Sequence, residues 1–564
     1  MKRRLADTRE SGVGRRVSET DEAVSVLRPP TPDPRLPMID LGVAALLAIV
    51  VWMLYHKVLA LWFTLDDAYT IHVAVEHRLR EYFLDRSVWP QKLYTPLLLV
   101  ATKWELGAFA IDTTRWYLVQ LALTAAAGIA LYALLRLYFD ALGAAAVSLM
   151  FLAAAPLCGL TMALSGVHYF VALVFAALAV AVYVIALRRG RFSLTLLSAL
   201  LYFVAMLGKE TVVPIAILLP FLPERDPRQR VRFAVPHFVT LAAYLALRRA
   251  VIGTIAGGYG WAILPEEWMG ILLSRPMKSA IAMGGWYVVP LVVIGALLAL
   301  RNRRALALFV VAMVLAVGPM VPVSKGMQPR FALMPWLVLA IAFAAGVRTL
   351  NRRGIAIALL IIAPLATVAA NRKEWRVEFN LARRMSDEAR FFFFDMPPNG
   401  LLRAPAVPPA AMGEVNWLKT VYTHRPGGAG WFYDDFYLCA VGANGKRTWQ
   451  YDEARRSVIE ITSTLPESGA NFCGAIRNAA PLSVQFHHEG ETLIWHFGPY
   501  RDGTYRVLLA NGLGAFDVPA NDAFRLDAPG ITLRVRYQSP AGWVTYSPDF
   551  ALDFVHHPDT SWHR

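Results

Sequence analysis

Charge is scarce in this sequence. Only 17% of its 564 residues are charged, whereas soluble globular domains carry about 25% charged residues. Hydrophobic residues make up 56% of the chain, and its mean hydropathy is +0.43. The apolar residues gather in runs of about 20, the length that crosses a bilayer as one helix. The composition therefore excludes an ordinary soluble protein and predicts a multi-spanning membrane protein.

Cysteine is scarce too, with 3 residues in the whole chain. Cys158 lies in a predicted membrane span, where we interpret it as an inert packing residue. Cys439 and Cys473 lie in a region that we place outside the cytoplasm, where disulfides persist. Their pairing stays open, because a sequence gives no distance between them. The histidine pairs at 487–488 and 556–557 lack the spacing of a zinc site, so no metal site is predicted.

The sequence also lacks internal repeats, low-complexity blocks beyond alanine-rich helices, and a cleavable signal peptide. The first apolar run starts too late for a signal peptide and has no small-residue cleavage site, so we expect it to remain as an anchor. Residues 1–38 are polar and carry prolines at 29, 30, 32 and 34. We expect them to form a disordered cytoplasmic tail.

Acidic residues are under-represented in the first 370 residues. The chain holds 56 Lys and Arg against 41 Asp and Glu. Residues 371–564 contain 20 and 21 of these, which leaves 36 and 20 before them and a net charge of +16 there. The excess sits in short loops, as the positive-inside rule describes. We therefore interpret it as a sign of topology and exclude nucleic acid as a partner.

We expect a polytopic α-helical protein with about eleven transmembrane helices in residues 39–370. The expected spans are 39–61, 115–138, 143–162, 167–187, 193–208, 211–222, 233–252, 279–300, 305–322, 331–347 and 355–370. The two halves of 193–222 are short for full spans, so a hairpin that dips through the bilayer is the alternative there.

Five basic clusters set the predicted orientation. They lie at 1–38, 188–191, 225–232, 301–304 and 348–353. With the spans above, all of them fall on one side, which the positive-inside rule assigns to the cytoplasm. We therefore expect a membrane protein with a cytoplasmic N-terminus. Loop 62–114 and the C-terminal domain would then be extracytoplasmic, or periplasmic.

The pattern of hydrophobic and polar residues changes after Ala370. Residues 371–409 predict a helix that leaves the membrane, followed by a short aromatic run and then a Pro-bounded linker. Short alternating runs between Gly, Asn and Pro turns then predict a β-rich domain over 410–564. Within it, the aromatic residues 431–433 have two interpretations. They contact carbohydrate beside Asp434 and Asp435, or they form a core strand before an acidic turn.

Two carboxylates, Asp66 and Asp67, follow the first span directly. Adjacent helical residues point about 100° apart, so only one of them can face a given cavity. The loop after them contains YTPLLLVATKWELGAFAI, which is apolar enough to lie along the membrane surface. A carboxylate held over such a surface is partly desolvated and becomes a better base. A solvated acidic loop is the alternative.

Charged residues also occur inside or beside the predicted spans. Lys209 and Glu210 lie between two short apolar runs, where charge is costly unless it is paired or faces water. They present a cation to an anionic headgroup, or they form a re-entrant tip in interfacial water. Lys325 and Arg330 lie on the Asp66 side, where basic residues are rare. They are interfacial anchors, or Arg330 holds a phosphate through two hydrogen bonds.

His168 and Arg248 lie near the ends of two further spans on the same predicted face. A histidine in such a place serves packing or substrate binding, and the same choice applies to His72 and His77. Taken together, these side chains are the ones needed to transfer a chemical group from a membrane-anchored phosphate. A carboxylate would activate an acceptor hydroxyl, and cations would neutralise the leaving phosphate.

Six sequence segments, quoted below, resemble the GT-C fold integral membrane glycosyltransferases in their order and spacing along the chain. The resemblance is greatest to the bacterial branch related to protein O-mannosyltransferases and aminoarabinose transferases. It covers residues 39–370 and is carried by LDDAYTIH, YTPLLLVATKWELGAFAIDTTRWYLVQLALTAAAGIALYALLRLY, FLAAAPLCGLTMALSGVHY, LLSALLYFVAMLGKETVVPIAILLP, YLALRRAVIG and QPRFALMPWLVLAIAF. The acidic pair is DD where mannosyltransferases typically have DE, and His168 stands where relatives often have other polar residues. The C-terminal domain resembles no family.

The resemblance implies inverting transfer of a sugar from a polyprenyl-phosphate sugar to an extracytoplasmic protein, glycan or lipid, beside membrane lipids. It also implies a location in a bacterial inner (plasma) membrane. Asp66 would be the general base, and Asp67 would be structural or bind substrate. The donor phosphate would contact Lys209, Glu210 and Arg330, and further substrate contacts would come from His168, Lys325 and Arg248. No cofactor is implied, and dependence on a divalent metal stays open.

Two other functions remain as alternatives. One is a transporter or flippase of a lipid-linked sugar, with the charges lining a pathway. Transporters often show repeated halves and paired broken helices, which this sequence lacks. The other is a cell-envelope assembly protein without catalysis, which would leave Asp66, Lys209 and Arg330 without a role. The leading prediction is therefore a membrane glycosyltransferase.

Overall fold

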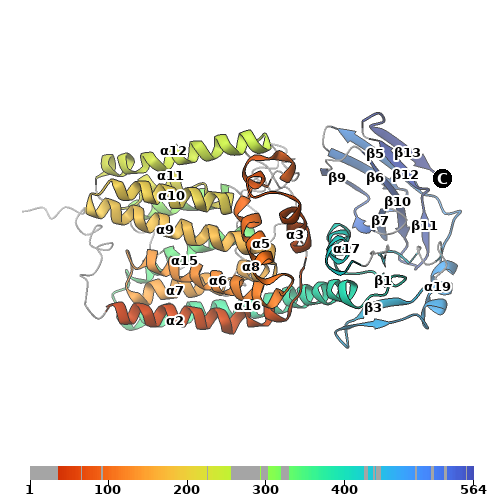
Figure 1. Ribbon diagram of the computed structural model, residues 1–564, viewed down its shortest axis with the longest axis horizontal. Helices are drawn as coiled ribbons and strands as arrows, with labels where there is room; N and C mark the ends of the chain where they lie inside the picture. The colour runs from red at the N-terminus through yellow and green to blue at the C-terminus, as the bar shows by residue number, and fades with distance from the viewer. Residues whose placement is uncertain are drawn as a thin grey trace, which may run out of the picture.

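The computed structural model describes residues 36–564 with gaps at 65, 90–92, 225, 319–328, 425–429, 436–438, 440–445, 490–491, 510–513, 526–529 and 554. A longer gap covers 256–302, apart from two helical residues. Most of the predicted tail, the predicted span 279–300 and the candidate residue Lys325 therefore lie outside the described residues. Helices form one part of the molecule and a β-rich part lies beyond one end of it, with α16 (Arg353–Phe394) running between them (Figure 1).

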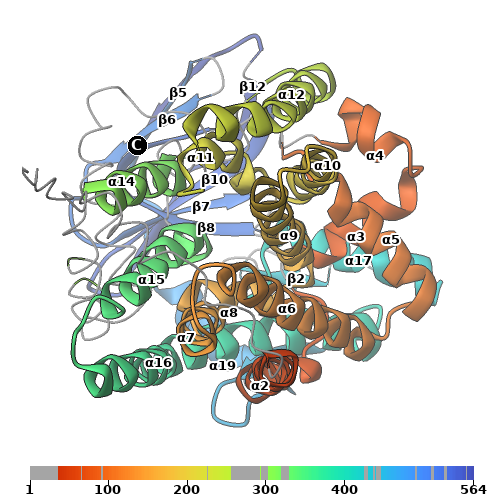
Figure 2. The same cartoon turned by 90° about the vertical axis from the view of Figure 1, so that its left-hand side faces the viewer.

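The helical part is a bundle whose segments match the apolar runs of the sequence. Its helices are α2 (Leu36–Tyr55), α6 (Thr113–Leu135), α7 (Ala141–Leu152), α8 (Ala155–Met162), α9 (Val167–Arg189), α10 (Ser193–Gly208), α11 (Ile215–Leu218), α12 (Pro227–Ile252), α14 (Arg303–Val317) and α15 (Leu333–Val347), together with α16. Figure 2 looks along the bundle, where α6 and α10 pack on either side of α9.

Among the described residues, six helical segments are long and apolar enough to cross a membrane. They are Met38–Ala60, Thr113–Leu135, Leu164–Arg189, Pro227–Ile252, Arg330–Val347 and Arg353–Arg372. The predicted span 143–162 is instead a pair of helices, α7 and α8, bent by 56°, which adds a seventh span if the pair crosses as one. The predicted segments 193–208, 211–222 and 305–322 correspond to shorter apolar helices.

Segment 193–222 forms a hairpin against α9. At one end, Nη2 of Arg188 pairs with Oε1 of Glu224 at 2.7 Å, so the chain returns to the end of α9. At the other end, Gly208 packs so closely on the start of α9 that an added Cβ would lie 3.1 Å from the His168 carbonyl oxygen. The return is made by η4 (Glu210–Val212), α11 and η5 (Leu219–Phe221). Lys209 is therefore at the tip, beside the first turn of α9.

Basic side chains tie the loops together at the opposite end of the bundle. Arg136 after α6 pairs with Asp40 of α2, with Nε and Oδ1 2.8 Å apart. Arg188 and Arg348 donate to backbone carbonyls in the loop after α6, at 2.8 and 2.6 Å. The loop ends that carry the described basic clusters thus meet at one end of the bundle, and the acidic pair lies at the other.

The predicted outer loop 62–114 is folded into short helices. After η1 (His56–Ala60) come α3 (Asp67–Glu76), α4 (Glu81–Leu84), η2 (Arg86–Val88) and α5 (Pro96–Phe109). α3 packs on α5 and also on α17 (Pro409–Thr423), which belongs to the C-terminal part. The loop therefore forms a layer between the bundle and the β-rich part (Figure 1).

The described residues of the C-terminal part form three sheets. α16 extends to Phe394, so the aromatic run that we expect to follow the helix belongs to it, and β1 (Leu401–Arg403) lies inside the expected linker. The first sheet has the order β2-β1-β3-β4, and the second has the order β11-β10-β7-β8 with β12 on β10. The third has the order β13-β5-β6-β9.

The strands are short, as turn spacing predicts. Their bounds are β2 (Trp431–Phe432), β3 (Thr448–Asp452), β4 (Ser457–Glu460), β5 (Ser483–Glu489), β6 (Thr492–Gly498), β7 (Thr504–Leu509), β8 (Gly514–Val518), β9 (Asn521–Arg525), β10 (Gly530–Gln538), β11 (Val544–Tyr546), β12 (Phe550–Asp553) and β13 (Asp559–His563). A core of alternating residues, including Val484, Trp495 and Val535, fills the space between the second and third sheets.

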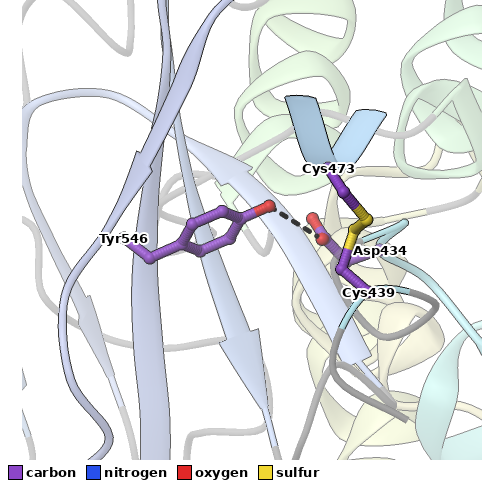
Figure 3. Close-up of a disulfide and its surroundings, with 4 residues drawn as sticks. All are labelled: Asp434, Cys439, Cys473 and Tyr546. Atoms are coloured by element: carbon purple, nitrogen blue, oxygen red, sulfur yellow. Dashed lines mark hydrogen bonds between the residues drawn. A yellow bond between two sulfur atoms is a disulfide. The ribbon is translucent and has the colours of Figure 1, made fainter. Parts of the chain in front are cut away.

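Cys439 and Cys473 form a disulfide, which answers the question that the sequence leaves open (Figure 3). Cys473 lies in α19 (Leu465–Gly474), and the two Cα atoms are 5.8 Å apart across 34 residues of sequence. Cys158 is a buried free thiol in α8, as expected for a packing residue. It contacts the side-chain oxygen of Asn371 on α16 at 2.9 Å.

Candidate active site

The acidic pair opens α3, and its two members differ sharply in environment. Asp66 is exposed at the N-cap, and its carboxylate makes no hydrogen bond or ion pair with the described residues. Asp67 is 2% exposed. Its Oδ2 accepts from the Thr64 backbone N–H and its Oδ1 from the Ser165 backbone N–H, both at 2.8 Å. The turn of about 100° between neighbours separates the two carboxylates.

Burial also changes the acidity of Asp67. Removal from water raises its pKa to about 6, while the hydrogen bonds from Thr64 and Ser165 act in the opposite direction. The carboxylate is fully engaged by backbone donors, so we interpret Asp67 as a positioning residue. It fixes the start of α3 against η3 (Leu164–Gly166) and leaves Asp66 facing outward.

His168 joins this arrangement through Ser165. Its Nδ1 lies 2.7 Å from the Ser165 carbonyl oxygen, which can only accept, so Nδ1 carries the proton. The backbone N–H of Ser165 is thus held by the Asp67 carboxylate, and its carbonyl oxygen is held by the His168 ring. Nε2 of the neutral ring is left as an acceptor. His168 is only 8% exposed, which agrees with a role in packing better than with a position open to solvent.

Lys209 and Glu210 form an ion pair at the tip of the hairpin. Nζ of Lys209 lies 3.0 Å from Oε1 of Glu210 and 5.0 Å from the centre of the Tyr169 ring. Lys209 is 2% exposed, whereas the Glu210 side chain is 22% exposed. Arg248 near the end of α12 is also 2% exposed, and its charge acts on Glu210. Such buried charges are costly unless they are paired, as they are here.

Arg330 completes the group from a distant part of the chain. It lies in η8 (Pro329–Ala332), which packs on α8. Its charge, like those of Lys209 and Glu210, acts electrostatically on the His168 ring. The structure therefore brings together His168, Lys209, Glu210, Arg248 and Arg330, all at the end of the bundle that carries the acidic pair.

Glu105 is a member of this region that the sequence interpretation missed. It lies in α5, is 2% exposed, and has a pKa raised to about 8 by burial and then by the charge of Asp67. A single carboxylate within the apolar run YTPLLLVATKWELGAF was the available signal, because an ionisable residue in apolar surroundings marks a functional position by default. At neutral pH this carboxyl group is mostly protonated.

His72 and Glu414 were also missed as a pair. Nδ1 of His72 lies 2.5 Å from Oε2 of Glu414 on α17, and Nε2 lies 3.0 Å from Glu76. The His72 ring stacks on Trp417 with 4.0 Å between ring centres. The C-terminal part is therefore docked on the helix that begins with the acidic pair. His77 instead faces Glu81 of the same loop at 3.5 Å.

Carbohydrate contact by Phe432 is not supported. Phe432 is fully buried, and Asp434 is 2% exposed and paired with Arg536. Asp435 pairs with Arg403 at 2.7 Å. The strand β2 contributes to a core and is followed by an acidic turn, which is the alternative interpretation. Within the described residues, no three His, Cys, Asp or Glu side chains are grouped to hold a metal ion.

No model of a known protein family matches this chain, and no curated protein matches it significantly. Among solved structures, it is similar to the crystal structure of the Archaeoglobus fulgidus oligosaccharyltransferase, tethered to an acceptor peptide containing the NVT sequon via a disulfide bond. The TM-score is 0.42 and the identity 12%, over 64% of this chain and 57% of the other. The chain thus spans little more than half the length of that enzyme.

Proposed function

We propose that the protein is a membrane glycosyltransferase that moves a sugar from a polyprenyl-phosphate sugar to an extracytoplasmic acceptor. The observation that carries the proposal is the position of Asp66. It is an exposed carboxylate without a side-chain partner among the described residues, and it lies at the end of the bundle where the buried cations Lys209 and Arg248 and the partly buried Arg330 gather. A base and a cation cluster at one membrane face are the groups that this reaction needs.

In the proposed reaction, Asp66 takes the proton of an acceptor hydroxyl. The acceptor oxygen then forms a bond to the anomeric carbon of the donor sugar. The bond between that carbon and the phosphate oxygen breaks, and its electron pair leaves with the lipid phosphate. Attack from the face opposite the phosphate inverts the configuration. No cofactor takes part in these steps.

Lys209 and Arg330 would stabilise the phosphate on which negative charge develops. Glu210 holds Lys209 at 3.0 Å and sets its position. The charge on Arg248 offsets that of Glu210. Because these groups are fixed before the donor binds, they need little reorganisation during the reaction. Binding of the donor and the rate of transfer would both depend on them.

The test uses membranes that contain the native acceptor, with radiolabelled polyprenyl-phosphate mannose and polyprenyl-phosphate aminoarabinose as donors. Transfer of label is measured for the wild type and for Asp66→Asn. The amide keeps the shape of the side chain but accepts no proton, so the rate should fall by about 10²- to 10⁴-fold.

The matched control is Asp112→Asn, which changes another exposed carboxylate of the same loop, paired with Arg115. It should transfer sugar like the wild type. Wild-type turnover by Asp66→Asn would exclude this residue as the base. Label that crosses the membrane with its sugar–phosphate bond intact would favour a flippase instead.

A further inference from the structure

The second sheet of the C-terminal part places two arginines side by side. Arg506 on β7 lies directly opposite Arg536 on β10. Like charges in such positions destabilise a sheet, and acidic residues compensate for them here. Asp517, opposite Arg506 on β8, accepts two hydrogen bonds at 2.6 and 2.8 Å. Asp434 pairs with Arg536 and accepts from Tyr546 at 3.3 Å (Figure 3).

A cavity of about 260 Å³ lies where these arginines meet the first sheet and α16. Four guanidinium groups line it, together with one carboxylate and one amide. Ala404 and Tyr433 also line the cavity. The charged and amide side chains are those of Arg384, Arg403, Arg506, Arg536, Asp435 and Gln450. They come from α16, β1, β7, β10, the turn after β2, and β3, so the cavity exists only where the two sheets and the long helix come together.

The arginines keep hydrogen-bonding capacity after their acidic partners are counted. Arg384 bonds Glu388 and Glu453 through Nε and Nη1, and Arg506 bonds Asp517 through Nε and Nη2. Within the described part of the chain, Nη2 of Arg384 and Nη1 of Arg506 donate no hydrogen bond. Nε of Arg536, whose side chain is 6% exposed, is buried without a partner among those residues. A buried donor without an acceptor is unfavourable and rare.

We propose that this cavity binds the phosphate or carboxylate group of a small, sugar-sized molecule. Guanidinium forks match the paired oxygens of these anions, and three of the arginines bring unused donors to the same space. Gln450 can bond hydroxyl groups beside the anion. The site is distinct from Asp66 and stands whether or not the protein transfers a sugar.

Asp435 would compete with such a ligand. Its two oxygens accept from Nε and Nη2 of Arg403 at 2.8 and 2.7 Å, the geometry that an incoming anion would adopt. Removal of this carboxylate would free the Arg403 fork and remove one negative charge from the lining. Asp435→Asn should therefore strengthen anion binding by several-fold, which a merely structural ion pair would not do.

The experiment measures binding of inorganic phosphate, glucuronate and glucose to the purified full chain by calorimetry. Arg506→Gln should weaken anion binding by about tenfold or more, and Asp435→Asn should tighten it. Arg534→Gln is the matched control. Arg534 lies on β10 and forms the same two-pronged bond with Asp549, at 2.9 and 2.8 Å, without lining the cavity.

Binding of either anion, with glucose bound much more weakly, supports the proposal, and the better anion identifies the group that the site takes. The proposal is overturned if neither anion binds the wild type at millimolar concentration. It is also overturned if Arg534→Gln loses binding as much as Arg506→Gln, or if Asp435→Asn weakens binding while remaining folded. Sugar transfer is not part of these measurements, so their outcome is independent of Asp66.

Discussion

At the scale of single residues, the two adjacent aspartates show how the backbone places identical side chains in different environments. Asp67 faces inward and is held by two backbone N–H groups, whereas Asp66 faces outward from the first turn of α3. A helix N-terminus favours negative charge, so both carboxylates gain from their position. The buried one fixes the helix and the exposed one is available for chemistry.

The raised pKa of Asp67 makes a prediction about stability. A pKa of about 6 in the folded protein, against 3.8 in a model compound, means that the folded state favours the protonated form. The contribution of this group to the free energy of unfolding is therefore largest below pH 3.8 and is lost as the pH rises through 6. The shift corresponds to about 3 kcal/mol.

This prediction is checked with Asp67→Asn in thermal unfolding between pH 4 and 7. The amide replaces one acceptor with a donor that faces a backbone N–H, so the variant should be less stable by about 1–3 kcal/mol at low pH. The difference from wild type should shrink as the pH rises. A difference that is constant over this range would show that Asp67 does not titrate there. The exposed variant Asp112→Asn is the control.

The sequence could predict the place of a residue when that place follows from the predicted spans. It could not do so when the place depends on contacts with distant parts of the chain. Counting the predicted membrane crossings assigns Asp66, Lys209 and Arg330 to one side of the membrane. The structure places all three at the same end of the bundle. The pair formed by His72 and Glu414 joins residues 342 apart in sequence, and no local pattern connects them. Burial of Glu105 depends on how α5 packs, which its own residues do not fix.

At the scale of elements, α3 joins the bundle to the C-terminal part. Its first residue is held by η3, and its middle contacts α17 through His72 and Trp417. Burial alone would lower the pKa of His72, but the hydrogen bonds that His72 donates to Glu414 and Glu76 outweigh burial and raise it above 6.5. The contact is therefore fully formed below pH 6.5 and weakens as the pH rises through the pKa of the folded protein.

We expect this weakening to appear in hydrogen exchange. Exchange of α17 amides, divided by exchange of β7 amides in the same sample, should rise between pH 6 and pH 9 in the wild type. Glu414→Gln removes the charge that favours protonated His72 and should make the ratio nearly independent of pH. Glu81→Gln, which alters the partner of His77 away from α17, is the control. An unchanged ratio in the wild type would show that the ion pair does not hold the two elements together.

The elements themselves were predicted with uneven success, for physical reasons. Long apolar runs such as that of α9 fix a helix by length alone, and the described spans appear where expected. Segment 193–222 was ambiguous because each half is short, and its hairpin is decided by the bond from Arg188 to Glu224 and by the close approach at Gly208. The bend between α7 and α8 lies at Ala153–Ala154, ahead of Pro156, where the sequence AAAP has no clear boundary.

At the scale of the whole molecule, the two ends of the bundle differ in charge and in what they carry. The basic loop ends meet at one end, through Arg136, Arg188 and Arg348, and the C-terminal part lies beyond the other. The positive-inside rule assigns the basic end to the cytoplasm. The acidic pair and residues 395–564 would then face the opposite compartment, where the disulfide of Cys439 and Cys473 is stable.

This orientation is tested by fusing reporters after Arg564 and into the loop at Gly190. Alkaline phosphatase, which is active only outside the cytoplasm, should be active after Arg564 and inactive at Gly190. A fluorescent protein that matures in the cytoplasm should give the reverse pattern. The physical reason is that moving the Arg-rich loops across the bilayer would bring several cations into hydrocarbon. Phosphatase activity at Gly190 with none after Arg564 would invert the molecule and place Asp66 in the cytoplasm, where an extracytoplasmic acceptor could not reach it.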